Sequence, residues 1–126
     1  IFNQKGEIYF RKIEHQLFHK VMANDETFVL SLGGGTPCYA NNHLLLSGKN
    51  TASVYLNASI DTLCSRLSFE RQNRPLIANL DEVEFKEYIA KHLFDRSFFY
   101  NQASFKILVN DKTPKQITDE VLNVLA

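Results

Sequence analysis

Short apolar runs alternate with longer amphipathic segments along the chain, and this alternation limits the fold to a small set of layered architectures. The apolar runs at residues 28–32, 52–56 and 105–109 have the length of buried strands. Between them, apolar residues recur at the spacing of one helical face. Strands that alternate with helices predict an α/β fold of three αβα layers with a parallel sheet, in a single domain over residues 1–126.

Capping residues mark where the predicted helices begin. Asp81 and Glu84 have the spacing of a capping box. Thr113, Pro114 and Gln116 combine a cap, a proline at the first helical position and a partner for the cap three residues on. The predicted helices span residues 8–22, a short stretch near 41–46, the residues after Ser59, residues 81–100, and the residues after Thr113.

The charge balance argues against partners that bind through a strong net field. The chain holds 14 Lys and Arg residues and 14 Asp and Glu residues, so we expect no nucleic-acid or membrane partner. No apolar run approaches the roughly 18 residues of a membrane span. Cys38 and Cys64 lack CxxC spacing, which argues against a disulfide or a zinc site. A cytoplasmic monomer is the expectation.

A glutamate and an arginine fall on the apolar faces of two predicted helices. At about 100° per residue, Glu14 lies among the apolar residues of the first helix, one turn after Arg11. Arg96 falls on the apolar face of the helix predicted at 81–100. Because isolated buried charges are costly, each needs a partner. Two interpretations stay open: Arg11 pairs with Glu14 and Arg96 with an internal carboxylate, or an anionic ligand binds here.

Three glycines, Gly33, Gly34 and Gly35, follow the strand predicted at 28–32. Glycine lets a backbone approach a ligand closely and leaves its amide N–H groups available as donors. The carboxyl end of a strand is also where ligands bind in open α/β sheets. The triplet is therefore a candidate binding loop, although three glycines also suit a simple tight turn.

Residues 68–80 form a long polar segment, interrupted by Pro75, in which no periodicity predicts a helix or strand. Arg66 just precedes the segment, which itself holds Arg71 and Arg74. The guanidinium group stays charged and binds phosphate oxygens in pairs, so a mobile loop rich in arginine suits phosphate capture. A solvated surface loop is the alternative.

Two further groups carry no strong functional signal. His15 and His19 have the spacing of a metal-binding pair, but they fall opposite the apolar face and lack a third ligand. The aromatic run at 98–100 is expected to lie in the core rather than to form a stacking platform.

Taken in order, these features resemble the shikimate kinase family from the first residue to nearly the last. Residues 6–14 are similar to the shikimate-binding helix of that family. By this resemblance Arg11 would bind the substrate carboxylate, Glu14 would hold Arg11 in position, and Phe10 would line the pocket. Each motif alone is weak, but their common order and compatible spacing make the match specific.

The glycine segment is the second part of the resemblance. Residues 31–35 are similar to the strand end and loop that contact the substrate hydroxyls in the family. Gly33, Gly34 and Gly35 would form this loop, with Gly34 as the main contact. Ser31 would lie near the magnesium site.

The resemblance also covers the parts of the family that bind ATP. Arg74, followed by Pro75 and Leu76, resembles the signature of the flexible lid, here at about residues 68–80. Arg74 would reach the ATP phosphates. The residues implied around the adenine are Arg66, Lys112 and Pro114.

Arg96 followed by Tyr100 resembles the second carboxylate-binding position of the family, although Phe98 and Phe99 stand where the family often has Pro and Leu. The resemblance implies transfer of the γ-phosphoryl group of MgATP to the 3-hydroxyl of shikimate, in the pathway to chorismate and the aromatic amino acids. Shikimate and ATP would be the ligands and Mg²⁺ the cofactor. The alternatives are a gluconate kinase-like or nucleoside monophosphate kinase-like enzyme, and a nonenzymatic ligand-binding remnant.

One part of the family pattern is missing. The phosphate-binding motif GxxxxGK[ST] occurs nowhere in the 126 residues, and the chain begins with Ile1 in what reads as the middle of a segment. We therefore expect a piece of a longer P-loop kinase, of nucleoside monophosphate kinase-like fold, without its N-terminal strands. The 126-residue chain alone is expected to be inactive, because that motif organises MgATP.

Overall fold

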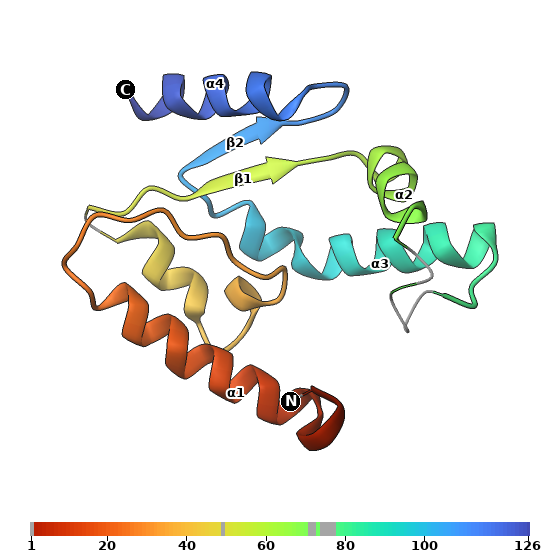
Figure 1. Cartoon of the computed structure of the whole chain (residues 1–126), viewed down its shortest axis with the longest axis horizontal. Coiled ribbons are helices and arrows are strands. Elements are labelled where there is room, and N and C mark those ends of the chain that lie inside the picture. The colour runs from red at the N-terminus through yellow and green to blue at the C-terminus, as the bar shows by residue number, and fades with distance from the viewer. Residues whose placement is uncertain (1, 49, 71–72, 74–77) are drawn as a thin grey trace. The chain divides into compact units, whose positions relative to one another are not determined.

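The structure is a computed structural model that describes residues 2–48, 50–70, 73 and 78–126 (Figure 1). The chain divides into two compact units, Ile1–Ser53 and Val54–Ala126. Each unit has its own set of internal contacts, and the two are described separately below.

The first unit is built around one long helix. Helix α1 (Phe2–Met22) covers the predicted helix at 8–22 and begins earlier, with a kink at Gly6. Gly6 has φ 83°, a backbone conformation that side chains with a Cβ rarely adopt, so glycine suits this kink. Two short 3₁₀ helices follow, η1 (Thr36–Cys38) and η2 (Asn42–Ser47), and η2 corresponds to the short helix predicted near 41–46.

Residues 28–32, all of which the structure describes, do not form the predicted strand, so this prediction is wrong. These residues have no regular secondary structure, and the side chains of Phe28 and Val29 are exposed. A strand exists only where its backbone N–H and C=O groups bond to a neighbouring strand. The described sheet consists of β1 and β2 alone, so an apolar run by itself is not enough.

The second unit is a parallel α/β arrangement. Strands β1 (Val54–Asn57) and β2 (Phe105–Leu108) lie side by side and pair in parallel, with Val54 opposite Phe105 (Figure 1). Parallel strands need a long crossover connection, which helices α2 (Ile60–Ser68) and α3 (Glu82–Tyr100) supply. Helix α4 (Pro114–Leu125) follows β2 and packs against it. The predicted parallel pairing and the helices that join the strands are confirmed.

The helix starts predicted from the capping boxes at Asp81 and Thr113 are also confirmed. The carboxylate of Asp81 accepts a hydrogen bond from the backbone N–H of Glu84 at 2.8 Å, and the Glu84 side chain completes the capping box. Thr113 and Gln116 form the same reciprocal pair at the start of α4. Each box satisfies backbone donors that the first helical turn leaves without a partner.

The core of the second unit lies between α2 and α3, and a side chain of β2 is buried as well. Phe85 and Ile89 of α3 are buried against apolar residues of α2, and Ile107 of β2 is 5% exposed. The prediction that the aromatic run at 98–100 is core is wrong for Phe98, which is 65% exposed. In the described residues, none of the helices combines the length and the apolar character that a membrane crossing requires.

Candidate functional site

The first unit has an open cavity of about 350 Å³ between one face of α1 and the segment that leads into the glycine loop. Four predicted site residues are among those that line it: Phe10, Glu14, Ser31 and Gly33. The other lining residues are Ile13, Leu17, Phe18, Val21, Leu30, Leu32 and Thr36. The wall is thus largely apolar, with one carboxylate, two hydroxyl groups and a glycine backbone.

The glycine loop approaches α1 closely. A Cβ added at Gly33 would lie 3.4 Å from Glu14 Oε2 and 3.5 Å from Thr36 Oγ1, so even a single added carbon atom would be in van der Waals contact with both side chains. Gly34 and Gly35 form the turn that follows, and the N–H of Thr36 donates to the carbonyl of Gly33 at 3.2 Å. The structure therefore brings the predicted loop and the predicted carboxylate together.

Arg11 pairs with a different glutamate from the one expected. Its guanidinium group forms an ion pair with Glu7, and the two side chains are 49% and 55% exposed. Glu14 instead has its Oε2 close to Gly33, and both residues line the cavity. In the part of the chain that the structure describes, Glu14 does not hold Arg11, so the expected Arg11–Glu14 pair is absent.

A buried carboxamide was not predicted from the sequence. Asn42 has no exposed surface, and its Oδ1 lies 2.6 Å from His15 Nδ1 and 3.1 Å from His19 Nε2. Its Nδ2 donates to the carbonyl of Thr36 at 2.9 Å. The i, i+4 spacing of the histidines is visible in the sequence, but nothing local marks an asparagine 23 and 27 residues further on as their partner.

Arg96 in the second unit lies beside Tyr100. Its Nη1 is 3.5 Å from the hydroxyl of Tyr100, whose ring centroid is 5.1 Å from that of Tyr55. Burial raises the pKa of the Tyr55 phenol, and the neighbouring Tyr100 raises it further. Among the described residues no carboxylate forms an ion pair with Arg96, so the internal carboxylate suggested as its partner is absent.

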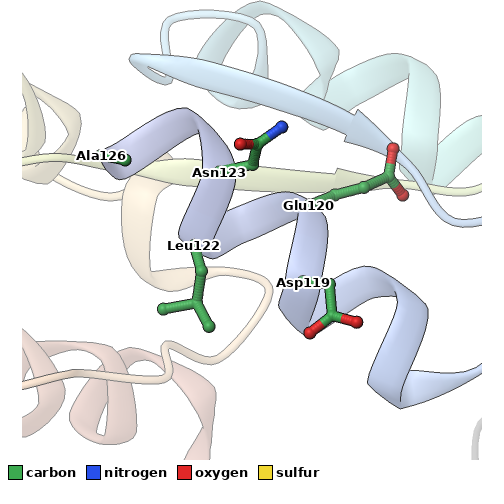
Figure 2. A pocket seen from close by; sticks show the side chains of 5 residues that line it. All are labelled: Asp119, Glu120, Leu122, Asn123 and Ala126. Atoms are coloured by element: carbon green, nitrogen blue, oxygen red, sulfur yellow. The ribbon is translucent and has the colours of Figure 1, made fainter.

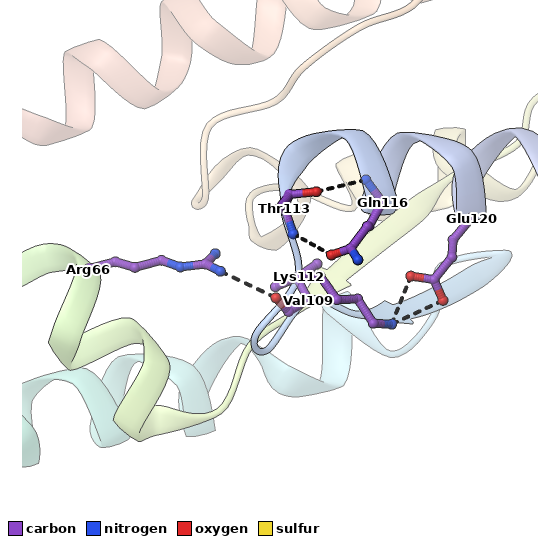
Figure 3. A network of polar contacts seen from close by, with 6 residues as sticks. All are labelled: Arg66, Val109, Lys112, Thr113, Gln116 and Glu120. Atoms are coloured by element: carbon purple, nitrogen blue, oxygen red, sulfur yellow. Dashed lines mark hydrogen bonds and ion pairs between the residues drawn. The ribbon is translucent and has the colours of Figure 1, made fainter.

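The predicted nucleotide-binding residues gather around the loop after β2 (Figure 3). Arg66 Nη2 donates to the carbonyl of Val109 at 3.2 Å, and Lys112 Nζ lies 2.7 and 3.0 Å from the carboxylate oxygens of Glu120. Pro114 is the first residue of α4, directly after the cap Thr113. The structure therefore brings Arg66, Lys112 and Pro114 to one loop. Arg71 and Arg74 lie outside the described residues.

A second hollow, of about 470 Å³, lies along α4 and contains only one residue discussed above, Glu120. Figure 2 shows its lining side chains spread along one helix: Asp119, Glu120, Leu122, Asn123 and Ala126. Because no second element contributes a polar group, this hollow lacks the convergent contacts of a ligand site.

Possible metal ligands do not form large clusters within the residues that the structure covers. No three His, Cys, Asp or Glu side chains there are grouped so that they could hold a metal ion. Cys38 and Cys64 form no disulfide in the described structure, and burial is the main influence that raises the pKa of the Cys64 thiol.

The fold matches a solved kinase structure. The crystal structure of shikimate kinase from Bacteroides thetaiotaomicron aligns with a TM-score of 0.83 and 31% identity, over 98% of this chain and 69% of that chain. The chain therefore has the α/β fold of P-loop kinases, and the predicted fold class is confirmed.

The sequence comparisons identify one family among the P-loop kinases. Residues 1–126 match the family model described as shikimate kinase. Shikimate kinase from Flavobacterium johnsoniae is 56% identical over 126 residues, which are 100% of this chain and 73% of that protein. Its counterpart from Flavobacterium psychrophilum is 46% identical over 125 residues, 99% of this chain and 73% of that protein. The chain belongs to the shikimate kinase family, and the prediction of an ATP-dependent phosphotransferase is confirmed.

Proposed function

We propose that the protein transfers the γ-phosphoryl group of MgATP to the 3-hydroxyl of shikimate. The observation that carries this proposal is the cavity in which the glycine loop meets Glu14, one turn after Arg11, in a chain that matches the family over its whole length. An apolar cavity with a few placed polar groups suits a small cyclic acid with hydroxyl substituents.

Arg11 is the proposed ligand of the substrate carboxylate. Its pair with Glu7 is about half exposed, and such surface pairs contribute only ~0–1 kcal/mol. Arg11 therefore loses little free energy when it leaves Glu7 for a substrate carboxylate. Away from solvent, that carboxylate can accept two parallel hydrogen bonds from the guanidinium group. Phe10 would pack against the substrate ring, and the amides of Gly33, Gly34 and Gly35 would bind its hydroxyl groups.

Glu14 takes a different role from the one that the resemblance implies. Because its carboxylate faces Gly33 rather than Arg11, we propose that it accepts a hydrogen bond from a substrate hydroxyl or from a loop amide.

Arg96 is the second proposed carboxylate ligand. No described acidic side chain neutralises it, and its neighbour Tyr100 supplies a phenol rather than a charge. A half-buried guanidinium group without an acidic partner favours binding of an anion.

The nucleotide end of the reaction would use Arg66, Lys112 and Pro114 around the adenine, and Arg74 on the phosphates. Lys112 is held by Glu120 and Arg66 by the carbonyl of Val109, so both contribute mainly by fixing the loop after β2. Phosphoryl transfer depends on positioning and on charge stabilisation, which arginines near the phosphates supply.

Mg²⁺ is the proposed cofactor. The described residues gather no group of three acidic, histidine or cysteine ligands, which fits an ion that arrives with the nucleotide and keeps phosphate and water ligands. Ser31, which is among the residues that line the cavity, would lie near that ion and contribute at most a hydrogen bond to its water shell. When bound, Mg²⁺ would neutralise charge on the transferred phosphoryl group.

A cytoplasmic monomer that binds neither nucleic acid nor membranes completes the proposal. Its equal numbers of acidic and basic residues, 14 of each, leave no net field to attract nucleic acid or an anionic membrane.

A substrate comparison in the full-length enzyme tests the proposal. ADP release from MgATP should depend on shikimate and should yield shikimate 3-phosphate by mass and by phosphorus NMR. Gluconate and nucleoside monophosphates, the substrates of the rival kinases, should support less than about a hundredth of that rate. Turnover with one of these instead would overturn the assignment, and shikimate binding without any turnover would favour a nonenzymatic remnant.

A further inference from the structure

A buried asparagine joins the two walls of the candidate shikimate cavity. Asn42 Oδ1 lies 2.6 Å from His15 Nδ1 and 3.1 Å from His19 Nε2, and both histidines belong to α1. Asn42 Nδ2 donates at 2.9 Å to the carbonyl of Thr36, the residue that follows the glycine triplet. One side chain thus contacts the helix and the end of the loop.

Both contacts lie next to groups that form the cavity. His15 directly follows Glu14, which lines the cavity, and Thr36 lines it as well. The backbone N–H of Thr36 donates to the carbonyl of Gly33 at 3.2 Å, so a shift of Thr36 would also move the Gly33 backbone. Asn42 itself is not among the lining residues, so any effect on a ligand must pass through its neighbours.

The network specifies one arrangement of its members. A carboxamide oxygen only accepts, so each histidine must carry its proton on the nitrogen that faces Asn42. The backbone N–H of Asn42 donates to the carbonyl of Tyr39 at 2.9 Å, and the Tyr39 ring meets that of His15 edge-on at 5.6 Å. A fully buried polar side chain with these partners has little freedom to move, because any displacement leaves buried polar groups unsatisfied.

We propose that Asn42 is a positioning residue of the shikimate site, which sets the distance between the glycine loop and α1. The inference rests on the proposed function, because it concerns the same cavity. Losing Asn42 should loosen the separation of Glu14 from Gly33 and so weaken the binding of the acid. ATP binding, which the proposed function assigns to residues of the second unit and to Arg74, should change little.

The test compares variants in the full-length enzyme, assayed well below their unfolding temperatures. Asn42→Ala should raise KM for shikimate about tenfold, while KM for ATP stays within about twofold. Asn42→Asp keeps the shape and the acceptor for both histidines but cannot donate to Thr36, so it should raise the same KM by about threefold or more. This second variant keeps the proposal testable if Asn42→Ala does not fold.

Two further variants separate positioning from general stability. Asn41→Gly is the matched control, because Asn41 makes no cap hydrogen bond and its φ of 62° suits glycine, so both KM values should stay within about twofold. His15→Ala should raise KM for shikimate but not KM for ATP. The double variant with Asn42→Ala should raise KM for shikimate by less than the product of the two single increases.

Each result decides for or against the proposal. A selective rise in shikimate KM with non-additive coupling to His15 supports it. Equal changes in both KM values, or a lower denaturation midpoint with both KM values unchanged, would show that Asn42 only stabilises the fold. If wild-type enzyme turns over shikimate and Arg11→Ala weakens shikimate use while the Asn42 variants do not, this inference alone fails; if wild type does not use shikimate, the proposed function fails.

Discussion

Each of the two units is stabilised internally by a different kind of contact. Residues 54–126 form paired strands and capped α-helices over an apolar core that includes Phe85, Ile89 and Ile107. The first unit has one long helix, two 3₁₀ helices and a glycine loop, and a polar network centred on Asn42 joins them. Regular structure supports the second unit, whereas specific side-chain contacts shape the cavity of the first.

The strongest test of this contrast removes a core side chain of the second unit. Phe85 is 3% exposed, so Phe85→Ala should lower the free energy of unfolding by about 3–5 kcal/mol, through lost burial and a new cavity. Urea denaturation followed by circular dichroism measures the change. Val83→Ala is the control on the same helix, because Val83 is 67% exposed and its loss should matter little. A loss below about 1 kcal/mol for Phe85→Ala would mean that this core does not support the unit.

The next largest effects concern the two proposed carboxylate ligands, one in each unit. Arg11→Ala and Arg96→Ala each remove charge-assisted hydrogen bonds worth roughly 1.5–3 kcal/mol, so kcat/KM for shikimate should fall about tenfold to a hundredfold. KM for ATP should stay nearly constant, which steady-state kinetics with each substrate varied would measure. Lys12→Ala, next to Arg11 and exposed, is the control. Equal effects on both substrates would argue against the carboxylate assignment.

A smaller effect is expected at the start of α4. Thr113→Ala removes the hydroxyl that accepts from the N–H of Gln116 at 3.2 Å, and loss of such a cap lowers stability by ~1 kcal/mol. Thermal unfolding of the variant checks this. Lys115→Gln, whose pair with Asp119 is exposed, should change stability by less than about 0.5 kcal/mol. If the two variants behave alike, the capping box contributes nothing measurable.

The smallest expected effect belongs to the surface pair of the first unit. Glu7→Gln removes the partner of Arg11, and since that pair is about half exposed, stability should change by less than about 0.5 kcal/mol. KM for shikimate should stay within about twofold, because Arg11 is then equally available to the substrate. An increase in KM as large as that of Arg11→Ala would instead make Glu7 the residue that positions Arg11.

The same contrast explains what could be predicted from the sequence. The caps at Asp81 and Thr113 depend on residues three positions apart, and the strand at 105–109 on a contiguous run, so local patterns were sufficient. The predicted strand at 28–32 had the same local signal, but strand formation depends on a partner elsewhere in the chain.

The candidate site shows the same limit. The sequence pointed to Glu14 and the glycine loop, and the structure brings them together, since a helical face and a glycine triplet are local signals. The pairing of Arg11 with Glu7 could not be chosen over a pairing with Glu14, because both lie within one turn of the helix. The contacts of Asn42 with two histidines depend on the path of the chain between them.

The parallel pairing of β1 with β2 also bears on how fast the second unit folds. The backbone N–H of Ser59, just after β1, donates to Asn110 Oδ1 at 2.9 Å across 51 positions of sequence. Contacts of such separation require a long loop to close before they give any stabilisation, which slows folding. The capped helix α3 lies within that loop and can form from neighbouring residues alone. In refolding after dilution from denaturant, helical signal from α3 should therefore precede protection of the β2 amides from hydrogen exchange.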